Sequence, residues 1–126
     1  MLTNDFEFSS LQGILKWYMN KPVKIQDDEL ADRISIPESF IKDLHASGAE
    51  YRKFRLSYLV AIAIELKMTP EHALDFIHAD GYYLRKKIPE EKHYLFFLKR
   101  SGKISVSECN RILKHHGLPP LTPCKN

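Results

Sequence analysis

The fold is decided by the stretch Leu30-Ala31-Asp32-Arg33-Ile34-Ser35-Ile36-Pro37-Glu38-Ser39-Phe40-Ile41-Lys42-Asp43-Leu44-His45. Its apolar residues, at positions 30, 31, 34, 36, 41 and 44, follow the spacing of two short helices. A helix ending near Ile34 and another beginning near Pro37 leave three or four residues for the turn between them. Proline suits a first helical position because its missing N–H would have no partner there. The sequence therefore predicts two helices joined by a tight turn near Ser35.

This spacing is that of a helix-turn-helix, whose second helix can enter the major groove of DNA. The stretch resembles the helix-turn-helix of the lambda-repressor and Cro family, which runs Leu-Ala-x-x-Leu-Gly-Val-Ser-x-x-x-Ile-x-x-Ile. Ser35 stands where that family usually has glycine, and Pro37 where it often has serine. The residues on the family's apolar positions are Leu30, Ala31, Ile34, Ile36, Ile41 and Leu44. The resemblance implies a compact helical bundle that binds DNA.

The second half carries a looser resemblance. Its segments are Ala61-Ile62-Ala63-Ile64-Glu65-Leu66, then Asp80-Gly81-Tyr82-x-Leu84, then Glu108-Cys109-Asn110-x-x-Leu113-x-x-x-Gly117-x-x-x-Leu121. They are similar to small helix-turn-helix proteins of Gram-positive bacteria and their phages or mobile elements. The combined resemblance covers about residues 10–121, and it implies a bacterial transcription regulator.

Helix start and stop signals divide the rest of the chain. Ser9 and Gln12 resemble a capping box before a helix over 10–20, and Ser105 with Glu108 forms another before the last helix. The expected helices are 10–20, 27–34, 37–47, 56–66, 70–80, 89–100 and 106–116, with Gly48 ending the third.

The expected fold class is all-α: a lambda-repressor-like helix-turn-helix bundle extended by a second helical hairpin region, with about seven helices. The expected divisions are a flexible N-terminus (1–8), the helix-turn-helix bundle (9–67), a C-terminal helical extension packed on it (68–121) and a loose tail (122–126).

Composition indicates a soluble globular protein: 44% of the 126 residues are hydrophobic and 28% are charged. No apolar run approaches the roughly 20 residues needed to cross a bilayer. Two cysteines are too few for a disulfide framework, which favours a cytoplasmic location. The net charge of +3 hides an asymmetry, because residues 1–50 hold five Lys or Arg and nine Asp or Glu, whereas residues 51–126 hold fourteen and seven.

No motif in the sequence indicates an enzyme, a cofactor or a metal site. A glycine-rich phosphate loop, a His-Glu-x-x-His motif and a Cys-x-x-Cys motif are all absent from the sequence. The six histidines are best interpreted as surface or helix-end residues, since His115 and His116 diverge by about 100° around a helix. Cys109 is best interpreted as a small buried apolar residue.

DNA binding is the leading functional hypothesis. In the lambda-repressor-like pattern the early residues of the second helix reach base edges, and these correspond to Glu38, Ser39 and Lys42. Phosphate contacts would come from Arg52, Lys53 and Arg55, just after the helix pair, and from backbone N–H groups at helix starts. The family often has glutamine where Asp27 stands, and an ionised aspartate cannot donate to a phosphate.

The charge of the helix pair favours a second hypothesis. Residues 27–47 hold six Asp or Glu against two Lys or Arg, the wrong sign for a surface that faces phosphates. An acidic, repurposed helix-turn-helix can dock on a basic protein surface, such as that of a nucleic-acid enzyme, as a mobile-element counter-defence inhibitor or adaptor would. The candidate residues for that face are Asp27, Asp28, Asp32, Glu38 and Asp43.

Two further surfaces are left open by the sequence. A basic set in the second half can hold nucleic acid or be a solvated face; it comprises Arg85, Lys86, Lys87, Lys99, Arg100 and Lys103. The aromatic residues Tyr82, Tyr83, Phe96 and Phe97 cannot all face one core, so some of them are candidates for a contact or homodimer surface.

Overall fold

The chain is all-helical in the part described by the computed structural model, which covers residues 10–20, 24–46 and 54–123. These residues form seven helices and no strand. The helices are α2 (Leu11–Met19), α3 (Asp27–Ile34), α4 (Glu38–His45), α5 (Leu56–Glu65), α6 (Pro70–Ala79), α7 (Pro89–Lys99) and α8 (Val106–His115). The expected all-α class with about seven helices is therefore confirmed. None of the described helices is long and apolar enough to span a membrane.

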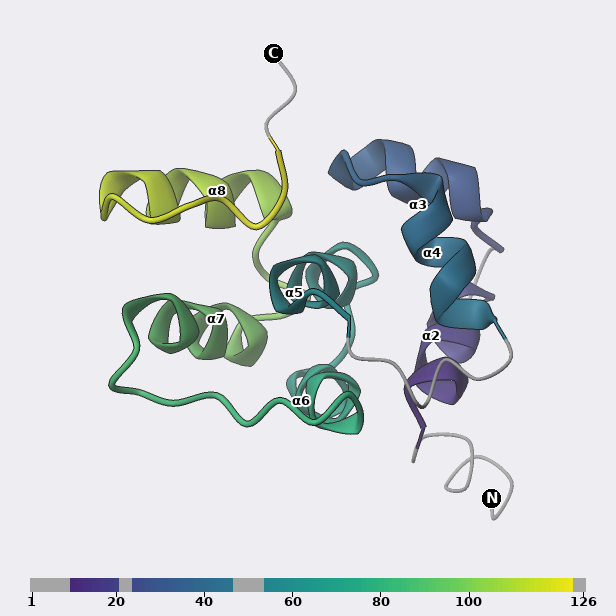
Figure 1. The fold of residues 1–126 in the computed structure, drawn as a ribbon, viewed down its shortest axis with the longest axis horizontal. Helices are drawn as coiled ribbons and strands as arrows, with labels where there is room; N and C mark the ends of the chain where they lie inside the picture. The colour runs from purple at the N-terminus through teal and green to yellow at the C-terminus, as the bar shows by residue number, and fades with distance from the viewer. Residues whose placement is uncertain (1–9, 21–23, 47–53, 124–126) are drawn as a thin grey trace.

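Helix α5 lies at the centre of the fold (Figure 1), where α3, α6, α7 and α8 all pack on it. Its sequence explains this position, because residues 59–64 are apolar without interruption and all six are buried. A helix that is hydrophobic on every side has to be covered on every side. Helix α2 packs on α4 and α6, and so joins the first helices to the later ones.

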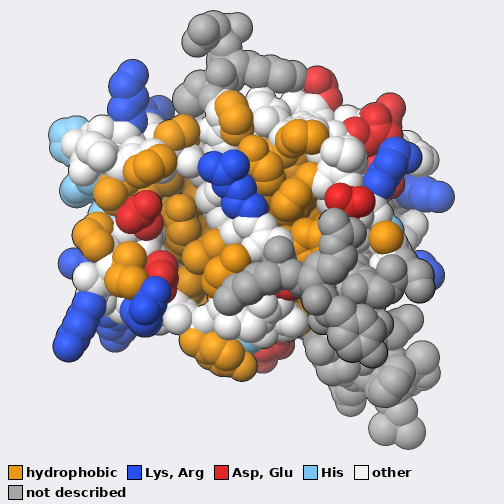
Figure 2. Space-filling view, viewed as in Figure 1, with side chains coloured by type: hydrophobic (Ala, Val, Ile, Leu, Met, Phe, Trp, Pro, Cys, Tyr) orange, Lys and Arg blue, Asp and Glu red, His pale blue; other side chains and the backbone are white. Residues whose placement is uncertain are grey.

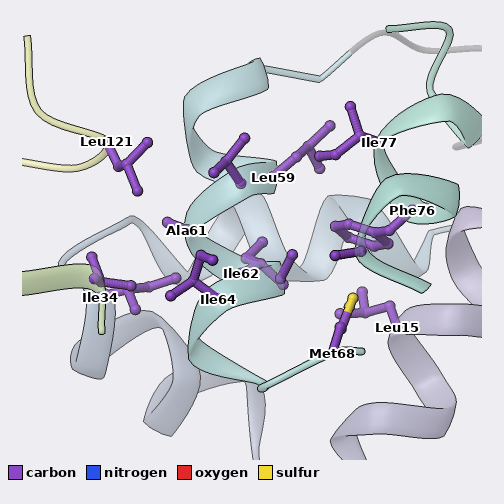
Figure 3. Packing of buried hydrophobic residues seen from close by; sticks show 14 of the residues in the cluster. Leu15, Ile34, Leu59, Ala61, Ile62, Ile64, Met68, Phe76, Ile77 and Leu121 are labelled. Carbon is purple, nitrogen blue, oxygen red and sulfur yellow. The ribbon is translucent and has the colours of Figure 1, made fainter. Parts of the chain in front are cut away.

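One continuous hydrophobic core links the early and late parts of the chain. Figure 3 shows the side chains of α5 in the middle of this core, with Ile34 of α3 and Leu121 of the C-terminal segment on one side. On the other side lie Phe76 of α6 and Leu15 of α2. The bundle and its extension therefore share their buried surface.

The turn between α3 and α4 consists of three residues, Ser35, Ile36 and Pro37. Ser35 adopts the left-handed conformation, with φ 60° and ψ 44°. This lets the N–H of Ile36 donate to the carbonyl of Ala31 at 3.1 Å, the backbone bond that closes many helix C-termini. Ser35 thus takes the conformation for which glycine is usually required.

The bounds of α4 differ from the expected 37–47. Pro37 precedes the helix in an extended conformation, so the first helical residue is Glu38. The helix ends at His45, since Ala46 is already extended with ψ 151°, and Gly48 lies outside the described residues. Helix α4 therefore ends two residues before the expected bound of 47.

Side-chain caps begin three of the other helices. The Ser105 hydroxyl accepts from the N–H of Glu108 at 3.1 Å while the Glu108 carboxylate accepts from the N–H of Ser105, so the expected capping box is confirmed. Thr69 caps α6 in the same way but without the return bond. In α2 the cap is Ser10, which accepts from the N–H of Gly13, and not Ser9, which lies outside the described residues.

The C-terminal segment departs from the expected loose tail at its first residue. Thr122 is buried beside Leu121 in the core. The N–H of Leu121 donates to the side-chain oxygen of Asn110 on α8 at 2.8 Å, which ties the segment down just before Thr122. Residues 124–126, like the expected flexible N-terminus at 1–8, lie outside the described residues.

Candidate functional site

The outward side of α4 carries the three residues that the sequence nominates for base contacts. Glu38, Ser39 and Lys42 are all exposed, whereas Ile41 and Leu44 on the opposite side of the helix are fully buried. The Lys42 ammonium lies 3.3 Å from the Glu38 carboxylate, one helical turn away. Such exposed pairs contribute at most about 1 kcal/mol, so a ligand can separate them at low cost. The three side chains form one small polar surface at the start of α4.

The acidic residues of α3 and α4 differ in their access to a partner. Asp28, Asp32 and Glu38 are exposed, whereas Asp27 and Asp43 are partly buried. The Asp27 carboxylate lies 3.3 Å from the imidazole of His45, the last residue of α4. Of the five residues nominated for a protein-contact face, three therefore present their carboxylates to solvent.

Only one of the three nominated phosphate-contact residues can be located. Arg55 precedes α5 and is exposed, and its guanidinium lies 4.7 Å from the centre of the Tyr58 ring. Stacking on an aromatic ring leaves the N–H groups at the edge of the guanidinium free to donate. Arg52 and Lys53 lie outside the described residues.

The nominated basic set occupies the two ends of α7. Arg85, Lys86 and Lys87 come before the helix, and Lys99, Arg100 and Lys103 lie at or beyond its last residue. An eleven-residue helix rises roughly 16 Å, so the two groups are well apart. The set consists of two separate clusters of three exposed cations.

Two of these cations are held by neighbouring side chains. Arg85 donates to both carboxylate oxygens of Glu91, at 3.3 and 3.0 Å, and these bonds hold the pKa of the Glu91 carboxyl below its ordinary value. The Arg100 guanidinium lies 3.7 Å from the centre of the Phe96 ring. The other four cations of the set are lysines, each a single charge on a flexible side chain.

The four aromatic residues that the sequence could not assign separate into buried and exposed pairs. Phe97 is fully buried, and Tyr82 is partly buried with its hydroxyl donating to the carbonyl of Phe54 at 2.6 Å. Tyr83 is 70% exposed and stacks on His78, while Phe96 is 42% exposed under Arg100. Tyr83 and Phe96 are therefore the two residues of this set whose rings are accessible to a partner.

Cys109 lies in the core, as the sequence indicates. It is fully buried on α8, and burial raises the pKa of its thiol to about 12. A protonated, inaccessible thiol is a poor nucleophile. Among residues 10–20, 24–46 and 54–123 no group of three or more His, Cys, Asp or Glu is arranged to hold a metal ion.

A pocket that sequence reasoning did not find opens between the first and last parts of the fold. It has a volume of about 680 Å³ and lies between the α3–α4 turn, the end of α5, α8 and the C-terminal segment. Its lining includes Arg33, Ser35, Glu65, Ser107, Asn110, Arg111, Lys114, Leu118 and Pro120. Because these residues are far apart in sequence, no local motif could reveal the pocket.

Charged side chains are distributed unevenly over one face of the molecule. In the face shown in Figure 2, hydrophobic side chains occupy much of the middle, and most Lys, Arg, Asp and Glu side chains lie toward the margins.

No protein-family model matches the chain, and comparisons with curated proteins and with solved structures also find no match.

Proposed function

We propose that the protein binds double-stranded DNA through α4, as a small sequence-specific transcription regulator. The observation that carries the proposal is the exposure of Glu38, Ser39 and Lys42 on a short helix whose other side, at Ile41 and Leu44, is fully buried. A helix fixed on one side and polar on the other is what insertion into a major groove requires. The three-residue turn before α4 fits the same interpretation.

Each of the three side chains has a defined chemistry toward base edges. The Glu38 carboxylate can accept from the N4 amine of cytosine, and the Ser39 hydroxyl can donate or accept. Lys42 can donate to O6 or N7 of guanine, or to a phosphate. The 3.3 Å pair between Lys42 and Glu38 suits a groove in which the two residues read neighbouring bases.

The charge of the surrounding surface sets how this binding depends on salt. DNA affinity falls with the logarithm of salt concentration in proportion to the number of phosphates neutralised. Arg55 is the one nominated phosphate partner among the described residues, and exposed carboxylates at Asp28 and Asp32 oppose the backbone. We expect two to four phosphate contacts, which corresponds to a logarithmic slope of about −2 to −4.

The test begins with selection of duplexes from a random library at about 50 mM salt, where phosphate contacts are strong. Lys42→Ala is expected to weaken binding to the selected duplex about tenfold, since a good base contact contributes roughly 1–3 kcal/mol. Ser39→Ala is expected to relax the preference at one base pair. Lys16→Ala, which removes an exposed lysine from α2, is the matched control and should bind normally.

Two results would contradict this proposal. If no duplex is enriched at low salt, α4 does not read DNA. If Arg85→Ala or Lys99→Ala abolishes binding while Lys42→Ala and Ser39→Ala leave it unchanged, the contact lies on the second half of the chain.

A protein partner with a basic surface is the second candidate, because three of the five nominated carboxylates on α3 and α4 face solvent: Asp28, Asp32 and Glu38. Charge complementarity of this kind speeds encounter and excludes acidic competitors. A nucleic-acid enzyme, whose own groove is basic, is the class of partner that fits. The double change Asp28→Asn with Asp32→Asn should abolish capture of that partner, whereas Glu71→Gln with Asp75→Asn on α6 should not.

A further inference from the structure

The pocket beside the α3–α4 turn is built by two parts of the molecule, far apart in sequence, that both pack on α5. Arg33, Ile34 and Ser35 form one wall, and Ser107, Asn110, Arg111 and Lys114 of α8 form the opposite wall. Both α3 and α8 contact α5, and Glu65, the last residue of α5, lies at the pocket between them. In Figure 1 the end of α3 and the C-terminal segment after α8 face each other above α5. At about 680 Å³ the pocket has the size of a small-molecule site.

The charge of the lining is positive. Arg33, Arg111 and Lys114 oppose a single acid, Glu65. Arg33 is already engaged, 2.7 Å from Glu29 and 3.8 Å from Glu65. Arg111 and Lys114 make no ion pair with any residue in the described ranges, and both are exposed on one side of α8. They are three residues apart, so they project from neighbouring positions on one face of the helix.

The remaining lining divides into apolar and neutral polar parts. Apolar contact is offered by Ile34, Val106, Leu118, Pro120 and Pro123. Hydrogen-bonding groups are offered by Ser35, Ser107 and Asn110, although the side-chain oxygen of Asn110 already accepts from the N–H of Leu121. Two unpaired cations beside an apolar wall select for a ligand that carries an anionic group on an apolar body.

We propose that this pocket binds a small amphiphilic anion, a molecule with a phosphate or carboxylate group attached to an apolar moiety. Arg111 and Lys114 hold the anionic group, and the Leu118 and Pro120 wall covers the apolar part. Glu65 disfavours an anion and limits how deeply its charged group enters. This ligand site is separate from the proposed DNA contact on α4, and the proposal does not depend on DNA binding.

The test is a titration of the isotope-labelled full chain, followed by NMR, with phenyl phosphate as the probe. Inorganic phosphate and neutral benzyl alcohol separate the contributions of the charged and apolar parts. Phenyl phosphate is expected to bind with a dissociation constant of about 1 mM, as a ligand of its size allows. The amide shifts should concentrate at Ser107, Asn110 and Leu118, and both simpler probes should bind several-fold more weakly.

Four variants test the assignment of the charges. Arg111→Gln and Lys114→Gln should each weaken phenyl phosphate binding about three- to tenfold, because each removes one charged contact. Glu65→Gln should strengthen binding, since it removes the opposing carboxylate. Lys86→Gln causes the same loss of charge at an exposed position away from the pocket and should leave the dissociation constant unchanged.

Three results would overturn the proposal. The first is the absence of shifts at the pocket with about 10 mM probe, ten times the expected dissociation constant. The second is equal weakening by Lys86→Gln and Lys114→Gln, which would show attraction to the net charge only. The third is equal affinity for inorganic phosphate and phenyl phosphate, which would show that the apolar wall does not contribute to binding. Because Arg111, Lys114 and Lys86 are exposed, each variant should melt near the unmodified chain, and a thermal melt checks this.

Discussion

The α3–α4 unit (residues 27–45) and the α7–α8 unit (residues 89–115) are both pairs of helices joined by a short turn, yet their surfaces carry opposite charge. The first holds six Asp or Glu against two Lys or Arg, and the second holds three against six. Both units bury their apolar side against the same core around α5. Because both units contribute to one core, the difference in charge lies on the sides that they present to solvent.

The two units also differ in how strongly local signals define their helices. Helix α8 has a complete capping box and is followed by Gly117 in the left-handed conformation. Helices α3 and α4 have no side-chain cap, and the left-handed residue after α3 is a serine. The α3–α4 unit therefore depends more on the burial of its apolar residues, and α8 depends more on its own termini. Helix α7, like α3 and α4, has no side-chain cap.

The largest expected effect comes from the shared core. Leu44→Ala in α4 and Leu113→Ala in α8 both remove a fully buried leucine side chain. Each should lower the free energy of unfolding by about 2–5 kcal/mol. Because one core joins the units, both variants should unfold in a single transition when followed by circular dichroism and by Trp17 fluorescence. Two separate transitions in Leu44→Ala would instead mark the α3–α4 unit as an independent domain.

The residues that end the helices give the next largest effect. A side chain added at Gly117 meets no atom within 4 Å, so Gly117→Ala measures the left-handed backbone alone. It should destabilise the chain by about 1–2 kcal/mol. Ser35→Gly at φ 60° should stabilise it by less than about 1 kcal/mol, since the added freedom of the unfolded glycine offsets part of the relief. Urea unfolding measures the free energy of unfolding of both variants. If both changes stabilise the chain, or both destabilise it, the left-handed backbone does not account for the two effects.

The side-chain caps of the helices give the third largest expected effect on the free energy of unfolding. Ser105→Ala removes the acceptor for the N–H of Glu108 and should cost about 1 kcal/mol. Ser39→Ala, on an exposed and uncapped part of α4, is the matched control and should change the free energy of unfolding by less than about 0.5 kcal/mol. An equal loss in both variants would mean that the capping box contributes nothing particular to α8.

The same contrast explains what the sequence could and could not predict. Ser105 with Glu108, Thr69 with Pro70 and the glycine after α8 are local signals, and the helices that they bound lie close to their expected positions. The bounds of α4 differ from the expected 37–47 because Pro37 and Ala46 are both already extended, which neither the proline nor Gly48 reveals in the sequence. Glu38, Ser39 and Lys42 are nominated through the resemblance to the lambda-repressor-like pattern, and the structure places all three at exposed positions. The separation of the basic set into two clusters depends on the length of α7, and the pocket depends on packing around α5, which no local pattern contains.

The smallest expected effect lies at Glu65, where the two parts of the fold meet. Burial raises the pKa of its carboxyl above the ordinary value of 4.5, although the Arg33 guanidinium and the Lys67 ammonium act to lower it. The folded chain therefore holds this proton in a pH range above 4.5 in which the unfolded chain has lost it. Stability contributed by this group is then present at low pH and falls as the pH rises through that range.

Glu65→Gln should remove this dependence, so that its free energy of unfolding falls less than that of the unmodified chain between about pH 4.5 and pH 7. Urea unfolding at several pH values measures the slope, and Glu71→Gln, at an exposed position on α6, is the control. A steeper fall in Glu65→Gln would mean that the Arg33 pair, at 3.8 Å, outweighs the burial of the carboxyl. Glu65 would then hold α3 to the end of α5 through its attraction to Arg33, and its removal should loosen the α3–α4 unit.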